Sequence, residues 1–163
     1  MSAIDTCLRA NAGYAASYAK AHLPVRPGRA LAIVSCMDAR LDTGALLGLE
    51  EGDAHVIRNA GGVVTDDVIR SLAISQRLLG TREIMVIHHT DCGMLKFTDA
   101  ELKEAIQKET GISPHFAMGT FSDLEDEVRQ SVARIDASPF VKHKDGIRGF
   151  VYEVETGRLR EVE

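Results

Sequence analysis

The sequence predicts a single α/β domain in which helices cover both faces of a mainly parallel central sheet. Apolar runs at residues 31–36 and 83–89 alternate with segments of helical periodicity, and a further strand-like run lies at residues 54–59. The first two runs are almost continuously apolar, as are strands that are covered on both sides. With 163 residues the chain has the length of one domain, so we expect residues 1–163 to fold as one unit.

The N-terminal segment, residues 1–23, is predicted to be a helix over residues 3–22. Its stripe of apolar residues at helical spacing is narrow and consists mostly of small side chains: Ile4, Leu8, Ala12, Ala15 and Ala19. Such a helix buries little by itself, so we expect it to lie against the domain body or a second copy of the chain. Pro24 and Pro27 end the helical pattern before the core, residues 30–155.

The first core strand, residues 30–36, is followed by a short helix over residues 41–49 and a strand over residues 54–59. After a loop at residues 60–62, Thr65 is placed to cap a long helix, with Asp66 and Asp67 at the positive end of its dipole. The expected buried face of that helix comprises Val68, Ile69, Leu72, Ala73 and Leu79. Gly80 ends it, and the strand at residues 83–89 follows.

Two capping boxes predict the later helices. One begins at Thr98 and runs to Glu109, and the other begins at Ser122 and ends at Ser138 before a proline. The expected buried face of the second helix comprises Leu124, Val128, Val132 and Ile135. Residues 147–154 alternate as a strand, and a Thr-Gly turn predicts a hairpin with residues 159–162.

Charge and cysteine content limit the possible partners and the compartment. The net charge is −5 without a long basic run, which argues against nucleic acid or an anionic membrane as a partner and favours a small-molecule substrate. The chain has three cysteines, no signal-like segment and no apolar stretch long enough to cross a bilayer. We therefore expect a cytoplasmic protein, in which cysteines bind metal more often than they form disulfides.

A candidate metal site lies where two predicted strands end. Cys36 closes the first strand, whereas His89 and Cys92 follow each other in H-x-x-C spacing at the end of the strand at residues 83–89. The carboxyl ends of parallel strands meet at one edge of a sheet, which is where ligands bind. Two thiolates and one imidazole form a three-ligand zinc set, which leaves the fourth position open in a catalytic site.

Other cysteine and histidine residues are interpreted as structural or left open. Cys7 is a candidate fourth ligand, but its place in the N-terminal helix favours simple packing. His88 precedes His89 and points to the opposite face of an extended strand, so we interpret it as structural. The remaining histidines are scattered, and any of them can transfer protons: His22, His55, His115 and His143.

Asp38 and Arg40 lie directly after Cys36. As an exposed ion pair they contribute little to stability. Beside a metal, Asp38 can act as a fourth ligand in a closed form of the site, unless Arg40 holds it away by bidentate pairing. Held away, Asp38 is placed to accept a hydrogen bond from a hydroxide on the metal and to orient it.

Three blocks, in this order, resemble the signature of the β-class carbonic anhydrases: Cys36-Met-Asp-Ala-Arg40, Arg58-Asn-Ala-Gly61 and His89-Thr-Asp-Cys-Gly93. The resemblance covers residues 30–155. It implies one zinc ion per chain on Cys36, His89 and Cys92, and an Asp38–Arg40 dyad. The implied reaction is the reversible hydration of carbon dioxide to bicarbonate and a proton by metal-bound hydroxide.

The resemblance further implies a homo-oligomer, either a dimer or a dimer of dimers, in which the N-terminal helix extends to a partner subunit. It also implies that Gly61 and Gly93 bind substrate. The chain departs from the family pattern at Ala39, where serine is commoner, and it contains no Trp, on which one branch of the family builds a bicarbonate pocket.

Three alternatives remain. The same signature resembles carbonyl sulfide and carbon disulfide hydrolases, which implies hydrolysis of those substrates at the same zinc. A non-catalytic zinc protein closed by Asp38 is the second. A thiol redox protein is disfavoured, because Cys36 and Cys92 are not in C-x-x-C spacing.

Overall fold

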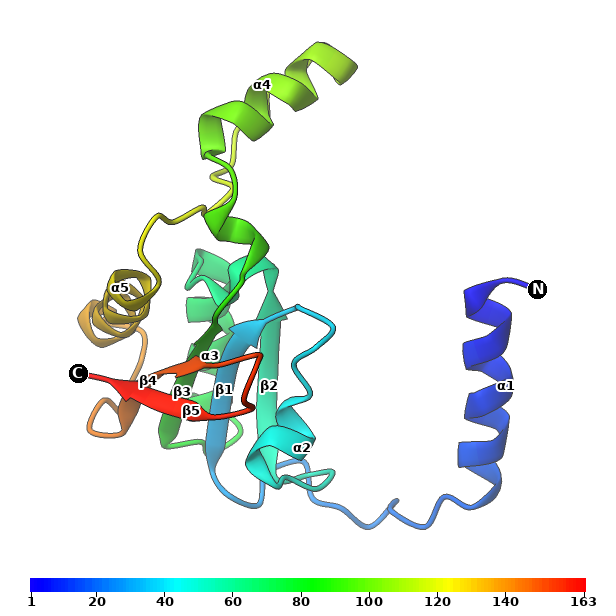
Figure 1. Ribbon diagram of the computed structural model, residues 1–163. Coiled ribbons are helices and arrows are strands. Elements are labelled where there is room, and N and C mark those ends of the chain that lie inside the picture. Colours follow the sequence, from blue (N-terminus) through cyan, green and yellow to red (C-terminus); the bar gives the residue numbers. More distant parts are fainter.

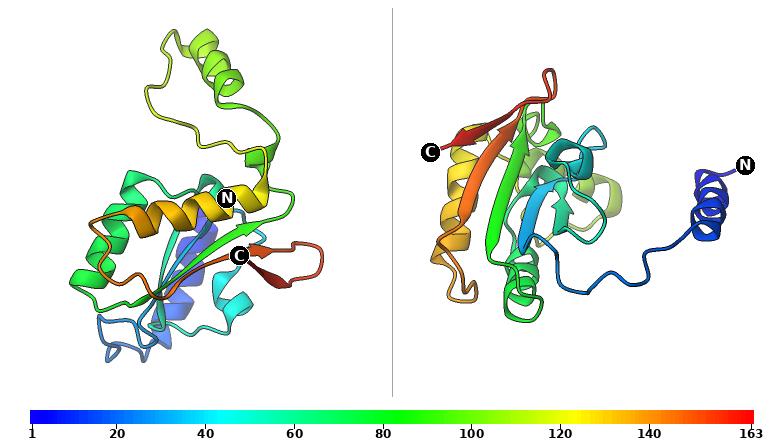
Figure 2. Two further views of the ribbon diagram at one scale, coloured as in Figure 1. Left: turned by 90° about the vertical axis from the view of Figure 1, so that its left-hand side faces the viewer. Right: turned by 90° about the horizontal axis from the view of Figure 1, so that it is seen from below.

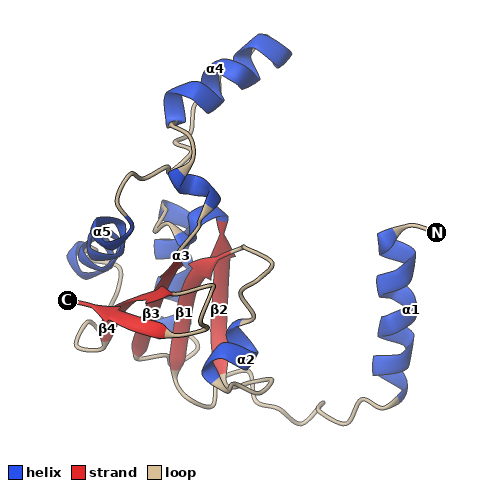
Figure 3. Cartoon of the chain, viewed as in Figure 1, coloured by secondary structure: helices blue, strands red, loops and turns tan.

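The computed structural model describes residues 1–163 and contains a five-stranded sheet in the order β2-β1-β3-β4-β5 (Figures 1 and 3). The strands are β1 (Leu31–Cys36), β2 (Ala54–Asn59), β3 (Glu83–His89), β4 (Ile147–Tyr152) and β5 (Leu159–Val162). The first four are parallel, and β5 pairs antiparallel with β4 as the predicted hairpin. The mainly parallel sheet is thus confirmed.

Helices lie on both faces of the sheet, although unequally (Figure 2). On one face α3 (Asp66–Arg77) and α5 (Leu124–Ala137) cover a cluster that includes Ala32, Val34, Ile84 and Val86. On the other face the short helix α2 (Thr43–Leu47), neighbouring loop residues and Leu159 of β5 pack against the cluster of Ile33 and Ile87. Side chains alternate along each strand, so both faces of β1 and β3 are buried.

Local capping explains where several helices begin. The Thr65 side chain accepts a hydrogen bond from the Val68 amide at the start of α3, and Thr98 forms a capping box with Glu101 at the start of α4 (Asp99–Thr110), both as predicted. The capping box predicted at Ser122 is wrong. Asp123 caps α5 instead, since its carboxylate caps as well as a hydroxyl and it directly precedes the first helical residue.

The buried face of α3 also differs from the prediction. Ala73 and Leu79 are only partly buried, whereas the polar residues Ser75 and Gln76 are buried. Gln76 is satisfied there because its side-chain oxygen accepts hydrogen bonds from two backbone amides and its side-chain nitrogen donates to the His143 carbonyl. Long-range backbone partners of this kind cannot be inferred from periodicity.

The N-terminal helix α1 (Ala3–Ala16) is shorter than predicted and projects from the body of the domain (Figures 1 and 2), to which the Tyr14 hydroxyl links it by hydrogen bonds to the Glu51 carboxylate. None of its residues is buried. The expectation that Cys7 packs in a core is therefore wrong: the residue is exposed, because α1 has no core in its own chain. The extension of this helix to a partner subunit stays a prediction.

The α4 helix and the loop at residues 111–121 project from the body of the domain at the top of the view (Figure 1). No residue of α4 is buried. The Asp99 carboxylate connects the start of α4 to the loop at residues 111–121, because it accepts hydrogen bonds from the backbone amides of Met118 and Thr120. No helix of the chain is both long and apolar enough for a membrane span.

Candidate metal centre

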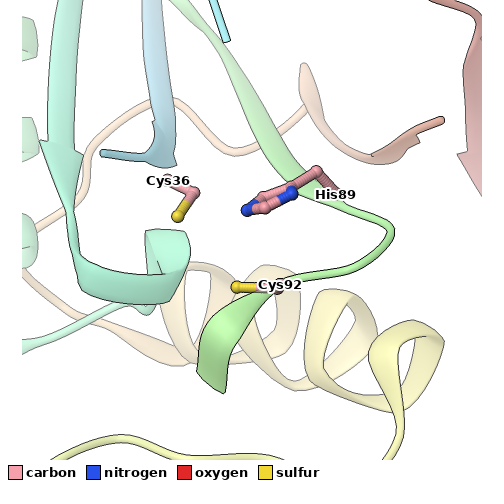
Figure 4. A group of neighbouring side chains, drawn as sticks. All are labelled: Cys36, His89 and Cys92. Carbon is pink, nitrogen blue, oxygen red and sulfur yellow. The ribbon is translucent and has the colours of Figure 1, made fainter. Parts of the chain in front are cut away.

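The ends of β1 and β3 bring the three predicted ligands together. Cys36 is the last residue of β1, His89 is the last residue of β3, and Cys92 follows in the loop. Their side chains point toward one another (Figure 4), and one ligand atom from each lies within 4.8 Å of the others. All three residues are buried, so the cluster is shielded from bulk water.

The imidazole of His89 has its metal-facing nitrogen free. Nδ1 lies 2.9 Å from the Thr90 carbonyl oxygen, to which it must donate, so in the neutral ring Nε2 carries the lone pair. Nε2 is buried and has no hydrogen-bond partner. A buried polar atom left unsatisfied costs about 1–3 kcal/mol, and a metal ion between Nε2 and two sulfurs removes that cost. The donor set therefore fits zinc.

The two thiols are electrostatically coupled. The hydrogen bond from Cys92 lowers the pKa of Cys36 to about 4, and the same bond together with burial raises the pKa of Cys92. Backbone amides of Asp38 and Gly61 also donate to the Cys36 sulfur. The pair thus takes one negative charge readily, whereas a second one needs a cation beside it.

Arg40 binds the Asp38 carboxylate through hydrogen bonds from its guanidinium and its backbone amide. Nε of Arg40 donates to Oδ1 of Asp38 at 3.0 Å and Nη2 donates to Oδ2 at 2.8 Å, while the Arg40 amide donates to Oδ1 at 2.9 Å. These hydrogen bonds hold the pKa of Asp38 well below its usual range. Oδ2 of Asp38 is nevertheless only 3.8 Å from Nε2 of His89, so the carboxylate borders the ligand cluster.

Two residues with contacts at the site were assigned no role from sequence. Arg58 donates from Nε to the Cys36 carbonyl at 2.9 Å and from Nη2 to the Asp38 carbonyl at 2.7 Å, which fixes the turn after β1. Asp91 accepts from Nη1 of Arg40 at 3.0 Å. Arg58 stands in one of the signature blocks and Asp91 in another, but nothing in the sequence indicates what either contacts.

A cavity of about 190 Å³ opens beside the ligand cluster. Both glycines predicted to bind substrate, Gly61 and Gly93, line it, and its wall is mainly apolar. The complete lining consists of Cys36, Met37, Asp38, Ala60, Gly61, Cys92, Gly93, Met94 and Phe97. None of the four scattered histidines lies among these residues, so the cavity of a single chain offers no histidine for proton transfer.

The backbone at Gly62 runs unusually close to β1. A Cβ atom there would lie 2.8 Å from the Cys36 amide nitrogen and 3.0 Å from the Ser35 carbonyl carbon, and φ is +71°. Only glycine meets both conditions without displacing the strand that carries Cys36. This contact packs the loop at residues 60–62 directly against the end of β1.

Comparison with known protein families decides the identity of the fold and site. The family model described as "Carbonic anhydrase" matches residues 31–159, which include the ligand cluster, Asp38 and Arg40. The chain belongs to the β-carbonic anhydrase family. It is therefore an enzyme of a zinc-dependent family, and its cofactor is zinc.

Relatives in this family cover the whole chain. The chain is 58% identical over 162 residues to β-carbonic anhydrase 1 of Mycobacterium tuberculosis, with 99% of each chain covered. A crystal structure of carbonic anhydrase from Streptococcus mutans has a TM-score of 0.94 at 47% identity, covering 100% of this chain and 99% of that one. A carbon disulfide hydrolase of Acidianus is 38% identical over 156 residues, covering 81% of this chain and 76% of its own length.

Within this β-carbonic anhydrase fold, His88 has a different environment from His89. It is fully buried, its ring meets Phe121 edge-on with 5.7 Å between centroids, and neither ring nitrogen has a hydrogen-bond partner. Burial lowers the pKa of His88 to about 4, so the ring is neutral at physiological pH. This environment agrees with a structural residue.

Proposed function

We propose that this protein catalyses the reversible hydration of carbon dioxide to bicarbonate and a proton, with one zinc ion per chain held by Cys36, His89 and Cys92. The observation that carries the proposal is the convergence of three buried ligand atoms within 4.8 Å beside a carboxylate engaged by arginine. Family membership supports the same reaction.

Each part of the site has a distinct task in this proposal. Zinc, when bound, would supply a Lewis acid that lowers the pKa of water. Asp38 would act as a hydrogen-bond acceptor that orients the attacking nucleophile toward the substrate carbon. Arg40 keeps Asp38 in this position. The apolar wall, which includes Met94 and Phe97, excludes competing water and admits a nonpolar triatomic substrate.

Gly61 and Gly93 shape the substrate space in this proposal. Gly93 has an exposed backbone at the cavity and can donate its amide to a substrate oxygen. Gly61 acts through the absence of a side chain, because its amide already points at the Cys36 sulfur. A Cβ at Gly61 would lie 3.0 Å from Cγ of Met94, which argues that a side chain there reduces the cavity.

The alternative of a non-catalytic zinc protein closed by Asp38 is less well supported. Both oxygens of Asp38 accept hydrogen bonds from Arg40, and one also accepts from the Arg40 backbone. Asp38 would have to give up at least one charge-assisted bond of about 1.5–3 kcal/mol to reach the metal. This cost favours an open fourth position.

Hydrolysis of carbonyl sulfide or carbon disulfide is the second candidate function. The similarity to the carbon disulfide hydrolase of Acidianus favours it, because the matched residues span most of both chains. An apolar cavity of about 190 Å³ also accommodates sulfur in place of oxygen. The two functions share the attacking nucleophile. Hydration of carbon dioxide expels no group, whereas hydrolysis of carbonyl sulfide or carbon disulfide also breaks carbon–sulfur bonds and releases hydrogen sulfide.

One preparation tests both candidates. Zinc-loaded protein is assayed by stopped flow for carbon dioxide hydration and, in parallel, for sulfide release from carbonyl sulfide and carbon disulfide. We expect the specificity constant kcat/KM to be larger for carbon dioxide. Sulfide release with the larger kcat/KM would replace the first function by the second, and activity on none of the substrates would refute both.

We also propose a homo-oligomer, a dimer or a dimer of dimers, in which α1 packs on a second copy. The apolar stripe of α1 is uncovered in its own chain, with Ile4 71% and Leu8 64% exposed. An exposed apolar stripe on a helix is typical of a surface that packs against another protein surface. A cytoplasmic location fits the same proposal, because the metal-binding thiols must stay reduced.

A further inference from the structure

We propose that Asp91 is a positioning residue for the reaction: it holds the guanidinium of Arg40 in place, and Arg40 in turn keeps Asp38 off the metal. This inference rests on the proposed function, in which the position of Asp38 decides whether the fourth metal position is open. Asp91 itself contacts neither the substrate cavity nor a ligand atom in this assignment.

The contacts of Arg40 divide between two loops. Nε and Nη2 donate hydrogen bonds to the Asp38 carboxylate. Nη1 donates to Oδ2 of Asp91 at 3.0 Å, and Nη2 also donates to the Asp91 carbonyl oxygen at 3.2 Å. Asp38 lies in the loop after β1 and Asp91 in the loop after β3. One guanidinium therefore joins the two loops that carry the metal ligands.

Arg40 needs this second anchor because it is not enclosed by protein. Its side chain is 48% exposed, and a long exposed side chain loses considerable rotamer entropy when it is held in one geometry. Its bonds to Asp38 join two residues of one loop, and solvent screens them at this exposed position, so they do not by themselves hold the arginine against the loop after β3. A carboxylate and a carbonyl from Asp91 supply the additional bonds.

The other oxygen of Asp91 is also engaged. Lys96 donates from Nζ to Oδ1 of Asp91 at 2.7 Å. Two acidic and two basic residues thus alternate in the order Asp38, Arg40, Asp91, Lys96. Because Lys96 neutralises part of the negative charge of Asp91, the hydrogen bond of Asp91 with Arg40 does not weaken the pairing of Arg40 with Asp38.

The backbone at Asp91 suggests the appropriate substitution. Its φ is +53°, a left-handed conformation that Asp and Asn adopt far more easily than most residues. Asp91→Asn therefore preserves the loop that carries Cys92. It leaves one neutral oxygen to serve both Arg40 and Lys96. Asp91→Ala would strain the same loop and confuse a positioning role with a folding defect.

The experiment compares zinc-loaded wild type with the Asp91→Asn variant by crystallography, elemental analysis and stopped-flow hydration. In the variant we expect one zinc per chain, Arg40 released from Asp91, and Asp38 turned toward the metal in part of the molecules. We expect kcat to fall by about three- to tenfold, the effect of a lost surface ion pair and its hydrogen bond, with KM nearly unchanged.

Two further variants show whether the effect passes through Arg40. Asp67→Asn makes the same chemical change in another exposed Asp–Arg pair, in which Nε of Arg70 lies 2.8 Å from Oδ1 of Asp67, and it should leave kcat and Asp38 unchanged. In an Arg40→Ala background, adding Asp91→Asn should have no further effect on kcat or on the Asp38 position, because the two residues act as one unit.

Three results would overturn the inference. Loss of zinc from Asp91→Asn would make Asp91 a structural residue of the ligand loop. An unmoved Asp38 with unchanged kcat would remove its positioning role, and a full additional effect in the Arg40→Ala background would mean that it acts independently of Arg40. Absence of hydration in the wild type would refute the proposed function alone, since the crystallographic position of Asp38 still tests the inference.

Discussion

Oδ2 of Asp38 lies 3.8 Å from Nε2 of His89, so the carboxylate that Arg40 holds and the nitrogen offered to the metal face the same small volume. Whether the fourth metal position is open depends on whether Asp38 stays paired with Arg40 or binds the metal. The contacts of Arg40 with both carboxylate oxygens favour the arginine.

Replacing Arg40 by alanine should lower turnover while leaving zinc bound. The variant loses charge-assisted hydrogen bonds of about 1.5–3 kcal/mol, so we expect kcat to fall by about 10- to 100-fold. Stopped-flow hydration and zinc analysis measure the two effects. Arg70→Ala, which removes an exposed arginine from α3, is the control. Normal turnover together with an unchanged open site in a crystal structure would refute the dyad.

Replacing Cys92 by serine should remove most of the zinc. A hydroxyl is a much poorer zinc ligand than a thiolate, and only Cys36 and His89 then remain. Elemental analysis after dialysis gives the zinc content. Cys7→Ser is the matched control, because Cys7 is exposed on α1 and is not part of the ligand cluster. Full zinc occupancy in the Cys92 variant would show that the ligand assignment is wrong.

Charge on the α1 stripe should weaken self-association. Substituting Ile4 and Leu8 by glutamate places two charges on the exposed apolar stripe, and deleting residues 1–23 removes it altogether. We expect both variants to dissociate at least tenfold more readily than wild type, as measured by sedimentation or light scattering, because burying two unpaired charges is unfavourable. Asn11→Glu on the exposed helix is a single-charge comparison. An intact protein that is monomeric at micromolar concentration would contradict the model.

Carbon dioxide hydration should increase through the alkaline range. Two thiolates offset the charge of zinc, so water is acidified less than at a three-histidine site, where its pKa is about 7. The acid limb of kcat/KM should therefore have a midpoint above about 7. Initial rates per zinc from pH 6 to 9 check this. A rate already maximal at about pH 6.5 would mean that the charge argument fails.

The Asp99→Asn variant should be less stable at neutral pH. Backbone hydrogen bonds from Thr120 are the main cause that lowers the pKa of Asp99. A carboxyl whose pKa falls on folding stabilises the fold above its unfolded pKa of about 3.9, and this contribution disappears as pH falls through the lower folded value. Because solvent screens the carboxylate, we expect a small loss of about 0.5–1 kcal/mol at pH 7 that shrinks toward zero below about pH 4. Denaturant unfolding of the metal-free proteins at several pH values measures it, and a pH-independent difference would contradict the assignment.

Much of the fold could be predicted because its signals are local. The strands at residues 54–59 and 83–89 are found where apolar runs begin and end, and Thr65 and Thr98 cap helices as their neighbours suggest. The convergence of Cys36 with His89 and Cys92 follows from a general property of parallel sheets, since strand ends share an edge.

The contacts that support the site could not be predicted, because they join residues far apart in sequence. Arg40 and Asp91 are 51 positions apart, and Arg58 reaches a carbonyl 22 positions away. The residues beside Arg40, Asp91 and Arg58 in the sequence do not distinguish these paired side chains from charged side chains that contact only solvent. The same limitation explains Cys7, because helical spacing predicts a stripe but does not indicate whether the chain itself covers it.

If α1 packs on a second copy as proposed, its separation from the body couples helix formation to protein concentration. A helix of 14 residues is marginally stable in water on its own, because most helical stability in proteins comes from tertiary packing. In this chain α1 buries none of its residues. In the proposed oligomer, packing on the second copy stabilises this helix beyond its own capping box, and dilution below the dissociation constant should melt the first 16 residues while the sheet stays folded. Part of the association free energy of that oligomer is then the cost of ordering a coil.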